Sequence, residues 1–495
     1  MADFFKINPA DNVIIALKDF SSGDVISVDG HKLEIVSDVP RGHKIALEPV
    51  AENENVIKYG FPIGHAIQPI SAGEHIHVQN LKTNLSGTIE YSFNQELNEL
   101  KYGQQNLTFQ GYKRANGKTG IRNELWIVPT VGCVNGQAQQ IADRFKAEME
   151  PDDIDAVEVF KHSYGCSQLG DDHTNTQKAL ADVINHPNAG GVLVMGLGCE
   201  NNQIDQLKTF IGNYDEKRVR FLVAQEVNDE VAAGIEIMKE IYRVMHNDKR
   251  EAVPVSELNI GLKCGGSDGF SGITANPLVG AFSDFLVAQG GTTILTEVPE
   301  MFGAETLLMA RAANEEIFNK TVSLINDFKD YYLQHNLPVY ENPSPGNKKG
   351  GISTLEDKSL GCTQKGGTAI VVDVLKYAEP LKTKGLNLLS APGNDLVAAS
   401  SLGFSGCHMV LFTTGRGTPF GSFVPTMKIS TNSDLYNRKR NWIDFNAGVL
   451  LEGKAMDEVL DNFVKFIIEV ASGKKLNHEK SDFKEIAIFK TGVTL

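Results

Sequence analysis

The sequence predicts an α/β protein in which a small all-β module precedes a larger region of parallel sheets covered by helices. Short runs of alternating apolar and polar residues, separated by turn residues, fill positions 1–88. From about position 109, strand-like and helix-like patterns alternate with a period of roughly 30 residues, the length of a β-α-β unit. The chain has 495 residues, too many for one hydrophobic core, so two to three domains are expected.

The N-terminal module is assigned to residues 1–88. Its strand candidates are NVIIAL, DVISV, KLEIV, HKIALEPV and HIHVQNL, spaced about 8–12 residues apart as in small all-β domains. In the segment EHIH, His75 and His77 should share one strand face, because alternate residues of a strand point the same way. Such a pair can ligate a metal, although an exposed pair is the simpler interpretation. Residues 89–108 are polar and weakly periodic, which predicts a linker.

Two α/β domains are expected after the linker, at residues 109–252 and 253–495. The strand candidates of the first are ELWIVPTVG, DAVEVFKHSYG, GGVLVMGLG and VRFLVAQE, and each precedes a helical pattern. The pattern restarts after KREAVPVSE with ELNIGLK, TTILTEV, AIVVDVL, LNLLSAPG and HMVLFTTG. Residues 338–367 are rich in proline and glycine and are expected to form a long irregular loop, either mobile or functional.

The composition excludes several classes of protein. A net charge of −15 disfavours a nucleic-acid partner. No run of 18 apolar residues is present, so no membrane partner is expected. The first residues, MADFFKINPADN, lack the pattern of a secretory signal, which favours a cytoplasmic location. Six cysteines without a C-x-x-C motif do not make a disulfide scaffold, so buried, catalytic or metal-binding thiols are expected.

Four of the cysteines occupy equivalent positions in the predicted topology. Cys133, Cys166, Cys199 and Cys264 each follow a strand candidate and touch a glycine. Because ligands of open parallel sheets bind beyond the carboxyl ends of the strands, these thiols are predicted to converge on one crevice. The alternative is that they are small buried side chains without chemistry. The two remaining cysteines, at positions 362 and 407, do not follow a strand candidate and are expected to matter less.

One short motif favours a hydrolase. The segment GGSDG fits the nucleophile elbow G-x-S-x-G, with Ser267 as nucleophile and Asp395 and His408 in the required chain order. However, His408 precedes its strand candidate, which would place it at the wrong end of the sheet.

Six longer segments carry a resemblance to a known family. GYKRANGKTGIRNELWIVPTVGCVN, HSYGCSQLGDDH, GLGCENNQ, CGGSDGFSGITANP, TEVPEMFGAE and TGRGTPFG resemble the altronate/galactarate dehydratase family over essentially the whole chain. The resemblance implies an N-terminal β-clip (SAF) domain, a Rossmann-like C-terminal part and homodimers. It also implies a hydro-lyase of hexuronate catabolism that converts the sugar acid D-altronate to 2-dehydro-3-deoxy-D-gluconate with Fe²⁺ or Mn²⁺. Galactarate dehydration, or a related lyase reaction of the family, is the alternative.

The implied reaction sets the requirements for the site. A base must remove the C2 proton, a cation must stabilise the enediolate, and the C3 hydroxyl needs an acid or metal to leave. The candidate metal ligands are Cys166, Cys199 and Cys264, followed by Cys133, Glu200 and Asp268. Thiolates favour iron or zinc over magnesium. Three cysteines also suit an iron–sulfur cluster, and the sequence does not separate a cluster from a single ion.

The remaining roles are assigned to strand-end and module residues. His162 is the first candidate for the base, followed by His65 and His173. Arg416 and Arg122 are candidates for binding the substrate carboxylate, and Asp395 for a further substrate contact. The N-terminal module is a candidate to close over the site and to contribute His65, His75 or His77. A sugar-acid binding protein without catalysis is the non-enzymatic alternative.

Overall fold

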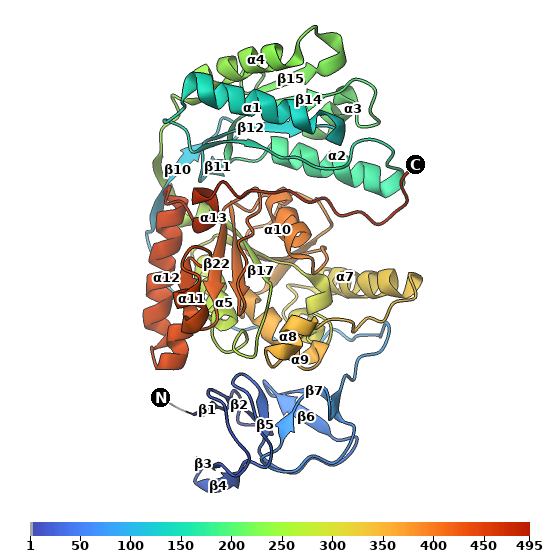
Figure 1. Ribbon diagram of the computed structural model, residues 1–495, viewed down its shortest axis with the longest axis vertical. Helices are drawn as coiled ribbons and strands as arrows, with labels where there is room; N and C mark the ends of the chain where they lie inside the picture. Colours follow the sequence, from blue (N-terminus) through green and yellow to red (C-terminus); the bar gives the residue numbers. More distant parts are fainter. Residues whose placement is uncertain (1–2) are drawn as a thin grey trace.

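The computed structural model describes residues 3–495 and contains three bodies. The C-terminal domain lies between the second domain and the N-terminal module (Figure 1). The predicted α/β class is confirmed, because small antiparallel sheets at the N-terminus are followed by parallel sheets with helices. Among the described residues, no helix is both long and apolar enough to cross a membrane.

The N-terminal module consists of short strands joined by tight turns. Strands β1, β2, β5 and β8 form one antiparallel sheet, β6, β7 and β9 form another, and β3 and β4 form a hairpin. The bounds are β1 (Phe4–Phe5), β2 (Val13–Ala16), β3 (Val25–Val28), β4 (His31–Glu34), β5 (Lys44–Ala46), β6 (Asn55–Lys58), β7 (Phe61–Ala66), β8 (His75–Ile76) and β9 (Leu81–Lys82). Residues 83–107 then run without regular secondary structure to the second domain.

The second domain is a four-stranded parallel sheet with helices on both faces. Its strand order is β13-β12-β14-β15. Helices α1 and α4 pack on one face, and α2 and α3 cover the other. All residues of β12 are buried, as expected for a strand with both faces covered. The bounds are β12 (Glu124–Pro129), α1 (Asn135–Met149), β13 (Ala156–Val159), α2 (Gly170–Ile184), β14 (Ala189–Gly196), α3 (Ile204–Ile211), β15 (Val219–Val223) and α4 (Glu230–Met245).

A small antiparallel sheet joins the second domain to the C-terminal domain. It contains β11 (Thr119–Gly120), β10 (Thr108–Lys113) and β16 (Glu251–Pro254), in that order. The pairing brings the start and the end of the second domain together. Trp126 of β12 and Leu402 of the C-terminal domain also belong to one hydrophobic cluster. The two domains therefore share a core.

The C-terminal domain is built on a seven-stranded parallel sheet with the order β19-β20-β18-β17-β21-β22-β23. The chain moves from β17 to one side and later returns to place β21 on the other side. The strands are β17 (Asn259–Cys264), β18 (Thr292–Leu295), β19 (Val371–Leu375), β20 (Leu386–Leu389), β21 (Met409–Thr414), β22 (Thr426–Ser430) and β23 (Phe445–Asn446). In such sheets the crevice for a ligand lies where the winding direction reverses, here beyond the ends of β17 and β21.

Helices cover both faces of this sheet. They are α5 (Ala275–Ala288), α6 (Glu305–Met309), α7 (Glu315–Gln334), α8 (Pro345–Lys349), α9 (Leu355–Cys362), α10 (Asp395–Phe404), α11 (Ser433–Arg438), α12 (Met456–Ala471) and α13 (Asn477–Lys480). Strands β22 and β23 were not expected from the sequence. Strand β22 is fully buried yet contains Lys428, whose ammonium donates to the carbonyl of Phe420 at 2.7 Å. Because of this polar composition, the strand was not predicted from the sequence.

The expectation of a long irregular loop at residues 338–367 is wrong. The segment contains α8 and α9, followed by a 3-10 turn at Thr363–Gly366. Ser344 begins α8 with a capping box, and Thr354 begins α9 by accepting a hydrogen bond from the amide of Asp357. Every residue of α9 is buried, so tertiary packing stabilises a helix that the proline and glycine content obscures.

A buried ion triad fastens the N-terminal module to helix α9. Lys44 and Lys58 of the module donate to Asp357 at 2.9 and 2.8 Å, and all three side chains are buried. Burial opposes the ionisation of Asp357, but the two lysines hold the pKa of its carboxyl well below the usual range. The triad is therefore charged at neutral pH.

We expect Asp357→Asn to destabilise the protein strongly, because the change leaves two buried ammonium groups without a countercharge. Breaking a buried ion pair costs about 3–5 kcal/mol. The matched control is Asp434→Asn, which breaks the exposed pair between Asp434 and Arg41 and should cost about 0–1 kcal/mol. Urea unfolding of the two variants measures the difference, and equal losses would contradict the role of the triad.

Candidate active site

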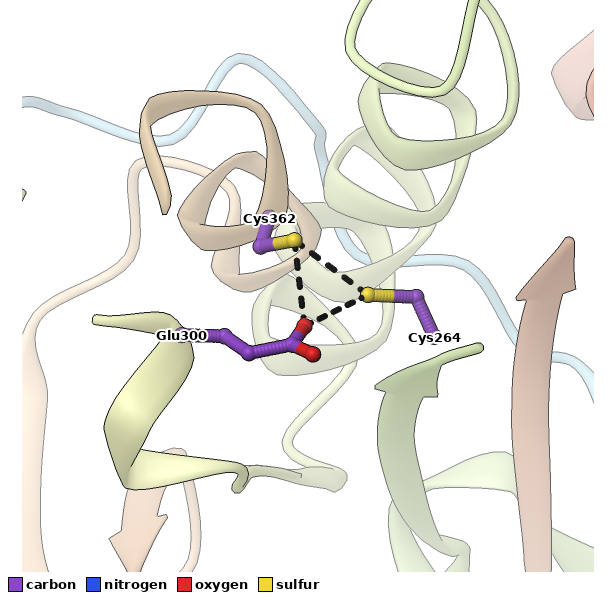
Figure 2. Close-up of side chains that lie close together, drawn as sticks. All are labelled: Cys264, Glu300 and Cys362. Carbon is purple, nitrogen blue, oxygen red and sulfur yellow. Dashed lines mark hydrogen bonds between the residues drawn. The ribbon is translucent and has the colours of Figure 1, made fainter. Parts of the chain in front are cut away.

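Two thiols and one carboxylate meet beyond the carboxyl end of β17 (Figure 2). Cys264 is the last residue of β17, Glu300 ends the short 3-10 turn after β18, and Cys362 is the last residue of α9. The Sγ atoms of Cys264 and Cys362 are 3.3 Å apart. The Oε2 atom of Glu300 lies 3.1 Å from the first sulfur and 3.2 Å from the second. We call these three residues the thiol cluster.

Two lysines neutralise the thiol cluster. The ammonium of Lys365 is 2.8 Å from the sulfur of Cys264, and that of Lys358 is 2.7 Å from Oε1 of Glu300. A hydrogen bond from the Cys362 thiol lowers the pKa of Cys264 to about 6, and both lysines act in the same direction. Burial opposes the ionisation of Glu300, but the same lysines lower its pKa to about 2. Both shifts favour the ionised forms, a thiolate at Cys264 and a carboxylate at Glu300.

A cavity of about 570 Å³ adjoins the thiol cluster. Its lining includes the glycines that follow β17, the start of α10, most of the 341–348 segment, and the side chains of Glu300, Lys348 and Lys358. Glu300 therefore belongs both to the thiol cluster and to the cavity wall. The cavity lies at the carboxyl end of β17, where a ligand is expected in an open parallel sheet.

Asp395 stands on the cavity wall and is held by a buried lysine. The ammonium of Lys263 donates to Oδ1 of Asp395 at 2.6 Å and lies 3.2 Å from Oε1 of Glu297. The Asp395 side chain is 44% exposed, whereas those of Lys263 and Glu297 are fully buried. A Cβ atom at Gly265 would lie 2.4 Å from the Asp395 carboxylate, so glycine is needed for this approach.

Glu297 has a strained backbone and a second contact with the thiol cluster. Its φ is 71°, in the left-handed region that glutamate rarely adopts, and its Oε2 atom accepts from the amide of Cys264 at 2.8 Å. Burial raises the pKa of this carboxyl well above its usual range. Such strain is typical of functional sites.

Two other predicted residues lie near the cavity. Arg416 is exposed after β21, and a Cβ atom at Gly266 would lie 3.4 Å from the Cβ of Arg416. The carboxylate of Asp268 is buried and accepts from Thr431 and Asn432 at 2.9 and 3.2 Å. These bonds fix the loops after β17 and β22. Arg416 therefore lies beside a glycine of the cavity wall, while Asp268 has the contacts of a structural residue.

The structure separates the predicted thiols into two groups. Cys133, Cys166 and Cys199 are exposed after β12, β13 and β14 of the second domain, whereas Cys264 is buried in the C-terminal domain. These thiols therefore belong to two different sheets, not to one. Glu200 accepts from the hydroxyl of Thr130 at 2.6 Å and from two amides of its own loop, so it fastens the loops after β12 and β14.

The predicted bases are not in the cavity wall. His162 is buried, donates through Nε2 to the carbonyl of Pro129 at 2.8 Å, and accepts at Nδ1 from the amide of Tyr164. Both ring nitrogens are therefore used, and burial lowers its pKa. His173 lies in the first turn of α2, and His65 is 2.7 Å from the side chain of Asn84 in the N-terminal module.

Two further sequence hypotheses meet structural obstacles. Arg122 is fully buried and forms a two-bond ion pair with Glu479 at 2.8 and 2.9 Å, which makes it a structural arginine and not a substrate ligand. In the hydrolase hypothesis, Ser267 follows the carboxyl end of β17 while His408 precedes β21. The two strands are parallel neighbours, so the two residues lie at opposite ends of the sheet.

Sequence reasoning missed Glu300 and the two lysines beside the thiol cluster, and it ranked Cys362 low. Glu300 lies in TEVPEMFGAE, one of the segments that carried the family resemblance. The segment KSLGCTQKGG contains Lys358, Cys362 and Lys365 at spacings of four and three residues. Such spacing places side chains on one helix face, a signal that the proline-rich context concealed.

The fold and site define a class: an α/β enzyme whose buried thiol cluster adjoins a cavity at the switch point of a parallel sheet. The chain belongs to the D-galactarate/altronate dehydratase family. Its SAF domain profile matches residues 2–84, its second-domain profile matches residues 111–246, and its C-terminal profile matches residues 255–494.

Similar proteins cover the full chain. Altronate dehydratase of Bacillus subtilis (strain 168) is 62% identical over 497 residues, covering 100% of both chains. Altronate dehydratase of Escherichia coli (strain K12) is 57% identical and covers 99% of this chain and 100% of its own. Galactarate dehydratase (L-threo-forming) of Escherichia coli (strain K12) is 34% identical and covers 96% of this chain and 94% of its own.

Proposed function

We propose that this protein is a hydro-lyase that dehydrates D-altronate to 2-dehydro-3-deoxy-D-gluconate in the cavity beside the thiol cluster. The observation that carries the proposal is the position of Glu300, whose carboxylate contacts both thiols and also lines the cavity. The similarity to two altronate dehydratases supports this substrate. The homodimer implied by the resemblance and the cytoplasmic location favoured by the first residues stay predictions.

The thiol cluster fits a single metal ion. Its three ligand atoms, two sulfurs and one oxygen, lie within 4.8 Å of one another and approach from three different elements. Thiolate ligands favour Fe²⁺ over Mn²⁺, which prefers oxygen ligands. Bound there, Fe²⁺ would supply Lewis acidity for the enediolate and for the leaving hydroxyl. Lys358 and Lys365 would then need to give up part of their contact with the anions.

The residues of the cavity supply the other functions of the reaction. Lys348 on the wall and Arg416 beside Gly266 bring positive charge that can bind the substrate carboxylate. Asp395 is the half-exposed carboxylate of the wall, and Lys263 fixes its orientation. We assign to Asp395 the removal of the C2 proton, because a base must be charged, accessible and held in place.

We expect the purified protein, reduced and supplied with Fe²⁺, to dehydrate D-altronate at least about tenfold faster than D-galactarate, as measured by formation of the 2-keto-3-deoxy acid. A tenfold ratio corresponds to about 1.4 kcal/mol of discrimination in the transition state. Galactarate has a second carboxylate where altronate has a hydroxymethyl group, so the far end of the cavity decides the ratio. Equal or faster turnover of galactarate would favour the alternative, a galactarate dehydratase.

The non-catalytic alternative is tested with the same sample. A sugar-acid binding protein would bind D-altronate in calorimetry without forming product. A chelator should abolish turnover in the dehydratase, and Fe²⁺ should restore it.

A further inference from the structure

Three histidines of the N-terminal module form a cluster outside the proposed active site. His43 precedes β5, His75 begins β8 and His77 follows it. Strands β5 and β8 are antiparallel with Lys44 opposite Ile76, so His43 faces His77, and His75 lies two residues away on the same side. The ring centroid of His43 lies 5.0 Å from that of His75 and 4.9 Å from that of His77.

Two nitrogen atoms of this cluster are close enough to ligate one ion, while the third histidine has to turn toward them. Nδ1 of His43 and Nε2 of His75 are 2.9 Å apart. Nε2 of His43 lies 3.3 Å from the carbonyl oxygen of Lys349, which fixes the proton on Nε2 and leaves the lone pair of Nδ1 directed at His75. Metal-bound histidines commonly donate a hydrogen bond from their second ring N–H to a carbonyl in this way.

The third histidine has an unsatisfied atom. Nδ1 of His77 is buried and finds no hydrogen-bond partner among residues 3–495. A buried polar atom without a partner costs free energy, so a ligand at this point would remove the cost.

We propose that His43, His75 and His77 bind one divalent first-row transition metal ion, separate from the thiol cluster. Imidazole nitrogen suits Zn²⁺, Fe²⁺ and Co²⁺. The rings of His75 and His77 are stacked 5.7 Å apart, so a side-chain rotation of His77 accompanies binding.

The position of this site gives it a role in closing the active site. His43 contacts Lys349, the residue after Lys348 of the cavity wall, and Lys44 donates to the carbonyl of Gly351 at 2.8 Å. The backbone of Gly42 also packs against Gly269, in the loop after β17. A metal ion that orders His43 therefore holds the module against two segments that surround the cavity.

The test uses the full-length Cys264→Ser/Cys362→Ser double variant, which lacks the thiol ligands, with Co²⁺ as probe. We expect one Co²⁺ per chain, with visible bands of a nitrogen-ligated ion and without the sulfur-to-cobalt charge-transfer band. Adding His77→Gln should weaken Co²⁺ binding at least about 100-fold, because even the loss of an outer-shell partner costs about 10–100-fold. His31→Gln, an exposed histidine of the same module, is the matched control and should bind as the parent does.

Thermal unfolding of the otherwise unchanged protein provides the second measurement. Zn²⁺ should raise the Tm of the unchanged protein by more than that of His77→Gln, in which only the thiol cluster is left to bind the ion. Without metal the two should unfold alike, since Nδ1 of His77 makes no hydrogen bond within residues 3–495. The proposal is overturned if the double variant binds no Co²⁺, or if His77→Gln binds it as tightly as the control. If the double variant does not fold, the unchanged protein is titrated with Co²⁺ instead. A charge-transfer band from the thiol cluster without a second bound equivalent of Co²⁺ would then overturn the proposal. That band reports the thiol cluster separately, so failure here leaves the proposed active site standing.

Discussion

Cys264→Ser should lower bound iron and turnover together, with kcat falling by at least about 100-fold. Of the two thiols of the cluster, Cys264 has the lower pKa and forms the thiolate more readily. A serine hydroxyl stays protonated and is a poor ligand. Loss of a ligand should exceed the roughly 10–100-fold cost of losing an outer partner. Iron per chain and kcat, measured anaerobically on the same sample, give the result.

Cys362→Ser should be nearly as severe, although the sequence ranked this thiol low, because its sulfur contacts both other members of the cluster. Cys407→Ser is the matched control. Cys407 is a fully buried thiol of the same domain, and burial raises its pKa to well above the usual value, so it is an inert core residue. Full iron content in both cluster variants would rule out the thiol cluster as the metal site and return attention to Cys133, Cys166 and Cys199.

Asp395→Asn should lower kcat by about 10²–10⁴-fold while bound iron stays at the level of the parent. The amide keeps the shape of the side chain and can still accept from Lys263, but it cannot take a proton. The KM for D-altronate should change little, since the C2 proton is transferred only in the transition state. A raised KM with unchanged kcat would instead support the substrate contact predicted from the sequence.

Glu341→Gln is the control for Asp395→Asn. Glu341 is an exposed carboxylate on the wall of the same cavity, so the change removes the same charge from the same space. We expect less than about a tenfold loss of kcat. Similar losses in the two variants would mean that net charge in the cavity, and not a specific base, limits the reaction.

Much of the fold could be predicted from local sequence patterns. The runs ELWIVP and NIGLKC became β12 and β17 because their apolar residues need cover on both faces of a sheet. The alternating HIH segment placed His75 and His77 on one side of β8, as predicted, with ring planes only 18° apart. Strand β22 and helix α9 were not predicted, because the buried lysines and glycines there are stabilised by tertiary contacts that a local sequence pattern does not contain.

The sequence by itself determined the α/β class, the strand that ends in Cys264, and the family resemblance. Only the tertiary structure decided which groups share a site. It joined Cys264 to Cys362, 98 positions later in the chain, and assigned the other strand-end thiols to a separate sheet. It also gave Arg122 and His162 buried hydrogen-bond partners, which are the contacts of structural residues. The physical reason is that strand periodicity is a local property of the chain. The ionisation and ligand capacity of a side chain, in contrast, depend on neighbours that are brought together only when the sheets and helices pack.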